Sequence, residues 1–284
     1  MTILATIEKK STTEAEIAFD TAREIVQEAI LSGLDRSNFF GHVAFHGGTS
    51  LRIFHDLDRF SEDLDFCVVD DGYEVDYDRL SNFVTTELES LGLNYAITKV
   101  RRGDGNTTGC YIEGNAVETL SLMGYDENIL KQIHPNMHLK VKMDVDLDTP
   151  SGYRLEHFYK TYPFQYGATL LDLPSLFAGK TSAVITRHWR NRTKGRDLYD
   201  FEWYISRQVP VNTRYLESNL MREGLVKESE LNRDTLLSIL EERFNKIDYN
   251  SGLEDLRPFL PKSRIPTDWS PEHFIELSKK IIVE

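Results

Sequence analysis

The alternation of apolar and charged residues between Met137 and Leu147 constrains the fold of this 284-residue chain more than any other feature. The apolar positions are Leu139, Val141, Met143, Val145 and Leu147, and the charged positions between them are Lys140, Lys142, Asp144 and Asp146. Because successive side chains of a strand point to opposite faces of its sheet, this pattern predicts a β-strand with one apolar face and one charged face.

The pattern of the chain changes near residue 165, from mixed α/β before it to nearly all helical after it. Before that point, periodicity predicts helices over Glu14–Leu34, Thr49–Asp56 and Tyr77–Leu93 and strands over Gly41–Gly47, Ser61–Val69, Tyr95–Arg102 and Cys110–Glu113. A turn over Gly103–Gly109, rich in Gly, Asn and Thr, is expected to join the last two strands. After it, helices are expected over Pro174–Trp189, Arg196–Arg207, Asn212–Glu223, Arg233–Lys246 and Pro271–Ile282. We therefore predict an α/β domain over residues 1–165 and a helical domain over residues 166–284.

Composition excludes several classes of protein. The net charge of −13 disfavours a broad, nonspecific grip on DNA. The two cysteines, Cys67 and Cys110, are too few for a disulfide framework or a Cys-based zinc site. No apolar run approaches the roughly 20 residues that span a bilayer, and Met1–Lys10 contains no signal-peptide core. We therefore expect a cytoplasmic protein without a membrane partner.

Asp63 and Asp65 are two residues apart in a predicted strand, so their carboxylates lie on one face of it. Asp144 and Asp146 lie in a second strand, and either supplies a third carboxylate if the two strands are neighbours. Like charges on one face repel and cost stability unless a cation compensates them. Mg²⁺ prefers carboxylate oxygens, and two such ions can activate a hydroxyl and neutralise a leaving pyrophosphate. The pattern therefore indicates a magnesium site.

The segment Gly47-Gly48-Thr49-Ser50 lies at a predicted turn from strand to helix. Glycines let backbone N–H groups approach a phosphate closely, and the N-terminus of a helix adds a positive dipole. A hydroxyl of Thr49 or Ser50 is a further donor to terminal phosphates. Each short motif is common by chance, but a glycine pair, an Asp-x-Asp strand and a later acidic strand in this order are far more specific.

A second group of charged residues follows in the helical part. Lys180 and Arg187 are seven residues apart, which places them two turns apart on nearly the same helix face. The segment Arg187–Arg196 holds five Lys or Arg residues and suits a triphosphate or RNA phosphates, its alternative being an exposed, solvated loop. Within it, Trp189 either stacks on a base or belongs to a core or interface.

Four motifs appear in a fixed order, namely His46–Arg52, Arg59–Phe66, the helix of Lys180 and Arg196–Asp200. Together they resemble the AbiEii/AbiGii nucleotidyltransferase toxins, of which the MenT tRNA-modifying toxins are relatives. The resemblance covers about residues 40–205. It implies an α+β fold, with a polymerase-β-like nucleotidyltransferase core built on a mixed sheet and a helical C-terminal region. It also implies the toxin half of a toxin–antitoxin or phage-abortive-infection pair.

The resemblance implies roles for individual residues. Gly48 and Thr49 would hold phosphate, Asp63 and Asp65 would bind metal, Asp144 would be the third carboxylate with Asp146 as its rival, Lys180 would contact the triphosphate, and Asp197 would have a positioning or base role. Gly47, Ser50 and Arg187 complete the expected nucleotide site. The alternative for Asp197 and Asp200 is structural, with both capping the next helix and pairing with Arg196 or Arg187. The broader superfamily has Ser where this chain has Thr49.

The function expected from these patterns is Mg²⁺-dependent transfer of a nucleotide from an NTP to an acceptor hydroxyl of tRNA or protein. A cognate antitoxin protein is the expected partner. Two alternatives stay open, a nucleotide- or partner-binding module without catalysis and a metal-dependent phosphoesterase.

Overall fold

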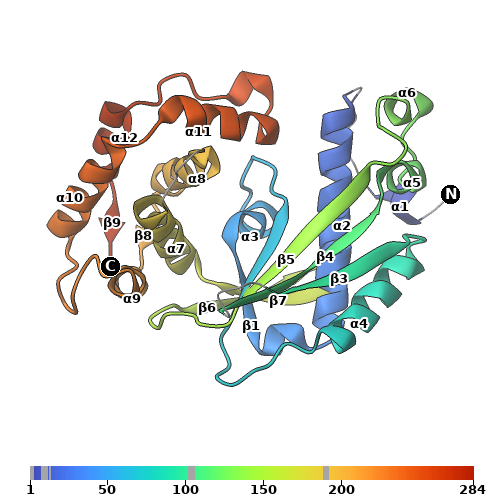
Figure 1. Ribbon diagram of the computed structural model, residues 1–284, viewed down its shortest axis with the longest axis horizontal. Coiled ribbons are helices and arrows are strands. Elements are labelled where there is room, and N and C mark those ends of the chain that lie inside the picture. The colour runs from blue at the N-terminus through green and yellow to red at the C-terminus, as the bar shows by residue number, and fades with distance from the viewer. Residues whose placement is uncertain (1–2, 8–11, 13, 102–105, 188–191) are drawn as a thin grey trace. The chain divides into compact units, whose positions relative to one another are not determined.

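The computed structural model describes residues 3–7, 12, 14–101, 106–187 and 192–284, and the chain forms two compact units. Unit 1 consists of Met1–Ser50, Ser61–Thr149 and His157–Leu170, and unit 2 of Leu51–Phe60, Pro150–Glu156 and Leu171–Glu284. Each unit is therefore assembled from separate stretches of the chain, which Figure 1 colours by residue number. Within the described ranges, no helix is both long enough and apolar enough to cross a membrane.

A mixed sheet lies mainly in unit 1 and has the strand order β3-β4-β5-β2-β1-β7-β6. Its strands are β1 (Val43–His46), β2 (Asp63–Val68), β3 (Tyr95–Arg101), β4 (Thr107–Asn115), β5 (His138–Asp146), β6 (Leu155–Lys160) and β7 (Tyr166–Leu171). Strand β2 runs parallel to β5 and antiparallel to β1, and β1 runs parallel to β7. The mixed sheet confirms the predicted α+β class.

Helices α2 (Ala15–Arg36), α4 (Tyr77–Ser90) and α5 (Ala116–Leu122) pack on one side of β3, β4 and β5 (Figure 1). The apolar side chains of β5 that were predicted to enter a core are at most 1% exposed from Leu139 to Val145. Helices α2 and α4 pack closely at Gly33, where an added methyl group would lie only 2.9 Å from Cα of Val84. Two short helices, α1 (Ile3–Thr6) and α6 (Glu127–Leu130), complete this part of the chain.

The predicted elements before residue 165 are present with shifted ends. The strand predicted over Met137–Leu147 is β5, and the helix predicted from Thr49 is α3 (Gly47–Phe54), which begins at the glycine pair. Strand β4 is longer than predicted, because Thr107 to Gly109 pair with β5 instead of forming a turn. Strands β6 and β7 were not predicted; β7 is buried at nearly every position and therefore lacks an alternating pattern.

Unit 2 is mainly helical and contains the helices predicted after residue 165. Its helices are α7 (Leu173–Thr186), α8 (Gly195–Ser206), α9 (Thr213–Arg222), α10 (Arg233–Phe244), α11 (Tyr249–Leu256) and α12 (Pro271–Ser278), and two short strands, β8 (Pro210–Val211) and β9 (Ile282–Val283), pair in parallel. Five helix starts are fixed by side chains that accept a backbone N–H, those of Asp172, Asn212, Asn232, Asp248 and Ser270. Helix α11 was not predicted. Helix α7 ends at Thr186, before the predicted end at Trp189, because the backbone of Arg187 is already extended; Trp189 itself lies outside the described residues.

Aromatic side chains form the core of unit 2. Phe177 of α7 stacks on Tyr204 of α8, with ring centroids 4.6 Å apart. Phe244 of α10 contacts Phe201 of α8 at 5.6 Å and Phe274 of α12 at 5.3 Å. All five rings are at most 1% exposed. Such pairs add specific geometry to the apolar burial, so they fix α7 and α8 relative to each other within the unit.

Candidate functional site

Asp63 and Asp65 lie half-buried on β2, next to the strand that carries Asp144. The parallel register of β2 and β5 pairs Asp65 with Asp144 and Asp63 with Lys142. Paired residues of neighbouring strands lie on the same face about 4.8 Å apart, so the side chains of Asp65 and Asp144 are adjacent. On the other side of β2, His46 pairs with Asp65. We call Asp63, Asp65 and Asp144 the acidic cluster.

Asp146, the alternative third carboxylate, lies farther along β5. Its register partner on β2 is Cys67, which is buried. One oxygen of Asp146 accepts a hydrogen bond from the backbone N–H of Asp148 at 3.1 Å, which closes the turn after the strand. Of the two alternatives, the register therefore places Asp144, and not Asp146, directly beside Asp65.

Lys142 supplies a positive charge to the acidic cluster. Its Nζ donates to Oδ2 of Asp144, and the two side chains are 24% and 15% exposed. The same lysine is the register partner of Asp63. The alternating pattern predicted Lys142 and Asp144 on one face, but the sequence held no signal that β2 lies next to this lysine, so its role was missed.

Two glycines leave space for the carboxylates of the acidic cluster. Gly47 has a φ of +82°, and a methyl group there would lie 2.6 Å from Oδ2 of Asp65. Gly109 of β4 pairs with Asp144, and a methyl group there would lie 2.8 Å from its Oδ1. Gly47 belongs to the predicted glycine pair, whereas Gly109 was expected in a turn. In both places a side chain would occupy the volume that a carboxylate oxygen now uses.

Helix α3 begins at Gly47 directly after β1, so the first N–H groups of the helix have no partner within it. The hydroxyl of Thr49 donates to the carbonyl of Asp63, and that of Ser50 donates to the carbonyl of Gly47 at 2.8 Å. Both residues are at most 1% exposed. The expected contact of a hydroxyl with phosphate would require these bonds to break. The backbone N–H groups of Gly47 and Gly48 are the donors that this helix start offers.

In unit 2, Lys180 of α7 lies between two aspartates of α8. Its Nζ is 2.8 Å from an oxygen of Asp197 and 2.8 Å from an oxygen of Asp200. Arg187 donates to the second oxygen of Asp197 at 2.5 Å. Burial of Asp197 opposes its charge, but Lys180 and Arg187 outweigh this effect and hold the pKa of its carboxyl below the usual range. The structure thus brings Lys180 and Arg187, two of the expected nucleotide contacts, together with Asp197, for which a positioning or base role was expected.

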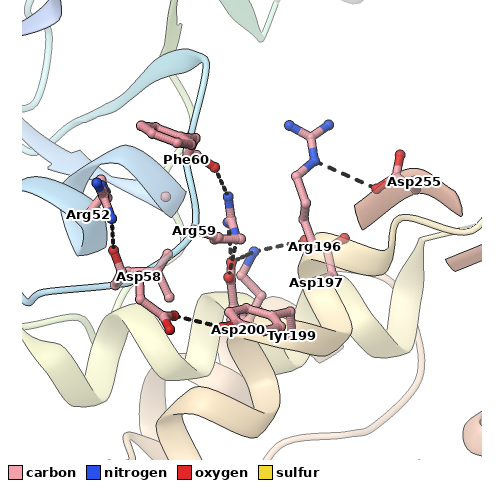
Figure 2. A network of polar contacts seen from close by, with 12 residues as sticks. Arg52, Asp58, Arg59, Phe60, Arg196, Asp197, Tyr199, Asp200 and Asp255 are labelled. Atoms are coloured by element: carbon pink, nitrogen blue, oxygen red, sulfur yellow. Dashed lines mark hydrogen bonds and ion pairs between the residues drawn. The ribbon is translucent and has the colours of Figure 1, made fainter. Parts of the chain in front are cut away.

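Arg59 forms a buried, two-pronged ion pair with Asp200 (Figure 2). Its Nε and Nη2 donate to the two carboxylate oxygens at 2.7 Å each, and the side chains are 3% and 0% exposed. Burial disfavours the charge of Asp200, but Arg59 and Lys180 together lower the pKa of this carboxyl. Of the alternative pairings with Arg196 or Arg187, that of Asp197 with Arg187 is present, whereas Asp200 pairs instead with Arg59 and Lys180.

The basic segment before α8 is partly engaged within unit 2. Arg192 lies 2.8 Å from one oxygen of the buried Asp255. Arg196 lies 3.6 Å from the other oxygen, and Figure 2 shows this contact. The guanidinium of Arg196 also lies over the ring of Phe259, 4.1 Å from its centroid. Trp189 lies outside the described residues, so its expected role stays a prediction. Arg192 and Arg196 therefore anchor α8 and its approach to α11.

The sequence match extends well beyond these motifs. Residues 29–276 match a family described as nucleotidyl transferase AbiEii toxin, type IV toxin–antitoxin system. The chain belongs to the AbiEii family. This AbiEii protein is accordingly a nucleotidyltransferase of the toxin type, which confirms the family that the four motifs resemble. No curated protein matches the chain.

Comparison with solved structures agrees with the fold of the AbiEii protein. MenT4, a nucleotidyltransferase toxin from Mycobacterium tuberculosis H37Rv, is 15% identical with a TM-score of 0.56, over 92% of this chain and 83% of MenT4. A suspected nucleotidyltransferase from H. pylori is 16% identical with a TM-score of 0.47, over 91% of this chain and 89% of that one. JHP933 from Helicobacter pylori is 15% identical with a TM-score of 0.45, over 91% and 86%. The likeness to MenT4 shows a shared fold.

The donors of the acidic cluster fit a hard divalent cation. They are carboxylates on two adjacent strands, and the ammonium group of Lys142 already binds Asp144 where a metal ion could bind. In the part of the chain that the structure describes, no three or more His, Cys, Asp or Glu side chains are gathered into a metal site. Oδ2 of Asp65 lies beside Gly47 on the β1 side of the β2–β5 pair, and Oδ1 of Asp144 lies beside Gly109 on the β4 side. The carboxylates therefore have to turn toward each other to share one ion.

Proposed function

We propose that this AbiEii protein transfers a nucleotide from an NTP to an acceptor hydroxyl with the help of Mg²⁺. The observation that carries the proposal is the register that sets Asp65 beside Asp144 in a member of a nucleotidyltransferase family. Asp63, Asp65 and Asp144 are the proposed metal ligands, and Asp144 is preferred to Asp146 for its place beside Asp65. Bound Mg²⁺ would make the acceptor hydroxyl more acidic and neutralise charge on the pyrophosphate.

The phosphates of the NTP are proposed to bind to two kinds of donor. The N–H groups of Gly47 and Gly48 at the start of α3 suit phosphate oxygens, because the helix dipole favours negative charge there. Lys180 has three ammonium donors, of which two are directed at Asp197 and Asp200, so one can still serve a phosphate. Arg187 is half exposed and can reach a phosphate without leaving Asp197.

Asp197 is proposed to position these cations and not to act as the base. A general base works best when its pKa is near the operating pH. The pKa of Asp197 is held below its usual range, with Lys180 and Arg187 outweighing its burial, so at neutral pH this carboxylate is a weak proton acceptor. Each of its oxygens accepts from one of the two cations, which keeps Lys180 and Arg187 on a common anchor.

The reaction exchanges one phosphorus–oxygen bond for another. The oxygen of the acceptor hydroxyl forms a bond to the α-phosphorus, and the bond from the α-phosphorus to the oxygen that bridges it to the β-phosphorus breaks. Pyrophosphate leaves with the electron pair, and the hydroxyl proton passes to solvent. Lys180 and Arg187 stabilise the negative charge that grows on the phosphates.

The proposed acceptor is a hydroxyl of tRNA or of a protein side chain, and membership in a toxin family supports a toxic outcome in the cell. The basic residues between Arg187 and Arg196 favour RNA over protein. A cognate antitoxin protein is the proposed partner, because the family description names a toxin–antitoxin system.

The proposal is tested by incubating the purified protein with each α-labelled NTP, Mg²⁺ and either total tRNA or cell protein. We expect label to enter one acceptor class with release of one pyrophosphate for each nucleotide transferred. Release of orthophosphate without label transfer would instead indicate a phosphoesterase. No transfer with any NTP and either acceptor would contradict the proposal.

Asp65→Asn is the decisive variant, because it removes one charge at constant shape. We expect its transfer rate to fall about 100- to 1,000-fold, as for loss of a group that stabilises transition-state charge. Asp78→Asn is the matched control, since the side chain of Asp78 is 87% exposed and lies outside the acidic cluster. A rate for Asp65→Asn close to that of Asp78→Asn would show that the acidic cluster has no part in the reaction.

A further inference from the structure

Lys142 is the positive side chain among the three carboxylates of the acidic cluster. It donates to Asp144 on its own strand and lies opposite Asp63 on β2. Three carboxylates on adjacent strand positions repel one another, and one ammonium group removes part of this repulsion. In the protein without nucleotide, Lys142 therefore has the electrostatic role that a metal ion would otherwise take.

The carboxylates next to Lys142 are turned toward separate spaces. Oδ1 of Asp144 uses the space at Gly109 on β4, while its Oδ2 accepts from Lys142. Oδ2 of Asp65 uses the space at Gly47, which directly follows β1, and β1 lies on the side of β2 opposite to β5. A divalent cation that draws Asp65 and Asp144 together has to compete with the ion pair of Lys142 for an oxygen of Asp144.

The ammonium group that a metal ion displaces from Asp144 is 24% exposed, so water replaces part of the lost attraction and a new anion restores the rest. In the proposed reaction, a phosphate of the nucleoside triphosphate would bind beside the metal ion and supply such an anion. The four-carbon stem of lysine lets Nζ move between two anions while its backbone stays in the strand.

We propose that Lys142 is a positioning residue that holds Asp144 until the nucleotide arrives and then binds a phosphate of that nucleotide. This inference rests on the proposed function, because it takes the acidic cluster as the metal site. Its consequence is that the metal ion alone binds weakly and that the metal–nucleotide complex binds well. The lysine thus makes metal binding depend on the substrate.

The test measures the affinity for Mn²⁺ alone by the electron paramagnetic resonance signal of free Mn²⁺. A second titration measures the affinity for Mn²⁺ complexes of α,β-methylene nucleoside triphosphates, in which the bond to be broken is replaced by a carbon bridge. For Lys142→Met we expect about tenfold tighter binding of Mn²⁺ alone and at least fivefold weaker binding of the Mn²⁺–nucleotide complex. Shifts of opposite sign would not follow from a general loss of structure.

Two variants control this test. Lys142→Arg keeps the positive charge and should restore both affinities to within about threefold of the original protein. Lys140→Met removes a lysine from the same face of β5, where Nζ lies 3.3 Å from Glu113 and 3.8 Å from the ring centroid of Tyr111. Because Lys140 is paired away from the acidic cluster, this variant should leave both affinities unchanged.

The outcomes separate the two proposals. If Asp65→Asn abolishes Mn²⁺ binding and label transfer while Lys142→Met binds Mn²⁺ no tighter than the original protein, the role of Lys142 is wrong and the proposed function stands. If Asp65→Asn binds Mn²⁺ with unchanged affinity, the acidic cluster is not the metal site and both proposals fail. If Lys142→Met tightens Mn²⁺ alone and weakens the complex, Lys142 has the proposed role.

Discussion

The protein contains two groups of opposite charges that differ in how they are built. The acidic cluster on β2 and β5 is half-buried, and Lys142 donates to Asp144 at its centre. In unit 2, Arg59 and Asp200 are almost completely buried and share two parallel hydrogen bonds. Lys180 adds a further contact to Asp200, so both carboxylate oxygens are used.

This difference decides which charges can exchange partners. Removing one member of a buried ion pair leaves a charge without solvent, which costs several kcal/mol. Near the surface, water replaces the lost partner and the cost is small. Arg59 and Asp200 are therefore a fixed support of α8, whereas Lys142 and Asp144 can separate when a stronger cation or anion arrives.

The largest expected effect is the destabilisation caused by Arg59→Met. The variant leaves Asp200 buried with only Lys180 as a counter-ion, so we expect the free energy of unfolding to fall by about 3–5 kcal/mol. Urea denaturation followed by circular dichroism measures this loss. Arg264→Met is the control, because the pair of Arg264 with Asp58 is 56% and 40% exposed and is expected to contribute less than about 1 kcal/mol. Equal losses in the two variants would remove the distinction between fixed and exchangeable charges.

The ion pairs that the sequence analysis missed show which features of a fold a sequence pattern can predict. The alternation over β5 predicted its two faces, because strand periodicity is a local property of the chain. The neighbours of β5 were not predicted, since register between distant strands leaves no local signal, and so Lys142 had no assigned role. Arg59 and Asp200 are 141 residues apart, and neither motif alone indicates the other.

The candidate site was predictable to the extent that its residues lie in compact motifs. Asp63 and Asp65 follow from spacing on one strand, and the glycine pair follows from its place before a helix. Gly109 was assigned to a turn because glycine is common in turns, although in β4 it serves to leave space for Asp144. The resemblance to a family added a functional role for Asp197 and assigned Lys180, which helical spacing had already placed beside Arg187, to the triphosphate.

The next effect is the pH dependence of stability that comes from the same buried ion pair of Arg59 and Asp200. Arg59 and Lys180 outweigh the burial of Asp200 and lower its pKa below the ordinary value of 3.8. The folded state therefore binds fewer protons than the unfolded state near this pH, so the stabilisation is present above pH 3.8 and is lost as the pH falls through the folded pKa. We expect the difference in unfolding free energy between the original protein and Asp200→Asn to narrow from pH 6 to pH 3. Urea titrations at each pH measure it, and a constant difference would contradict the assigned charge state.

A smaller effect is expected from adding a methyl group beside the acidic cluster. At Gly109 this group would lie 2.4 Å from the carbonyl oxygen of Met143 and 2.8 Å from Oδ1 of Asp144, so Gly109→Ala should lose about 1–3 kcal/mol of stability. At Gly179 in α7, no atom of the described residues outside the backbone of its own helix lies within 4 Å of the same position, so Gly179→Ala should gain about 0.5–1 kcal/mol from a better helix former. Thermal unfolding of the two variants compares them directly, and a gain from Gly109→Ala would show that β4 can move away from Asp144.

The smallest effect separates the two groups of charges most sharply. Lys142→Met, like Arg59→Met, replaces a cationic side chain by methionine, but the pair that it breaks is 24% and 15% exposed, so water can reach the remaining carboxylate. We expect a loss of about 1 kcal/mol or less in urea denaturation, together with altered binding of Mn²⁺. A loss of 3 kcal/mol or more, on the order of that for a buried pair, would mean that Lys142 is as fixed as Arg59. A lysine held so firmly to Asp144 would not be free to pass to a nucleotide, because the metal ion would have to supply that whole free energy before any phosphate contact formed.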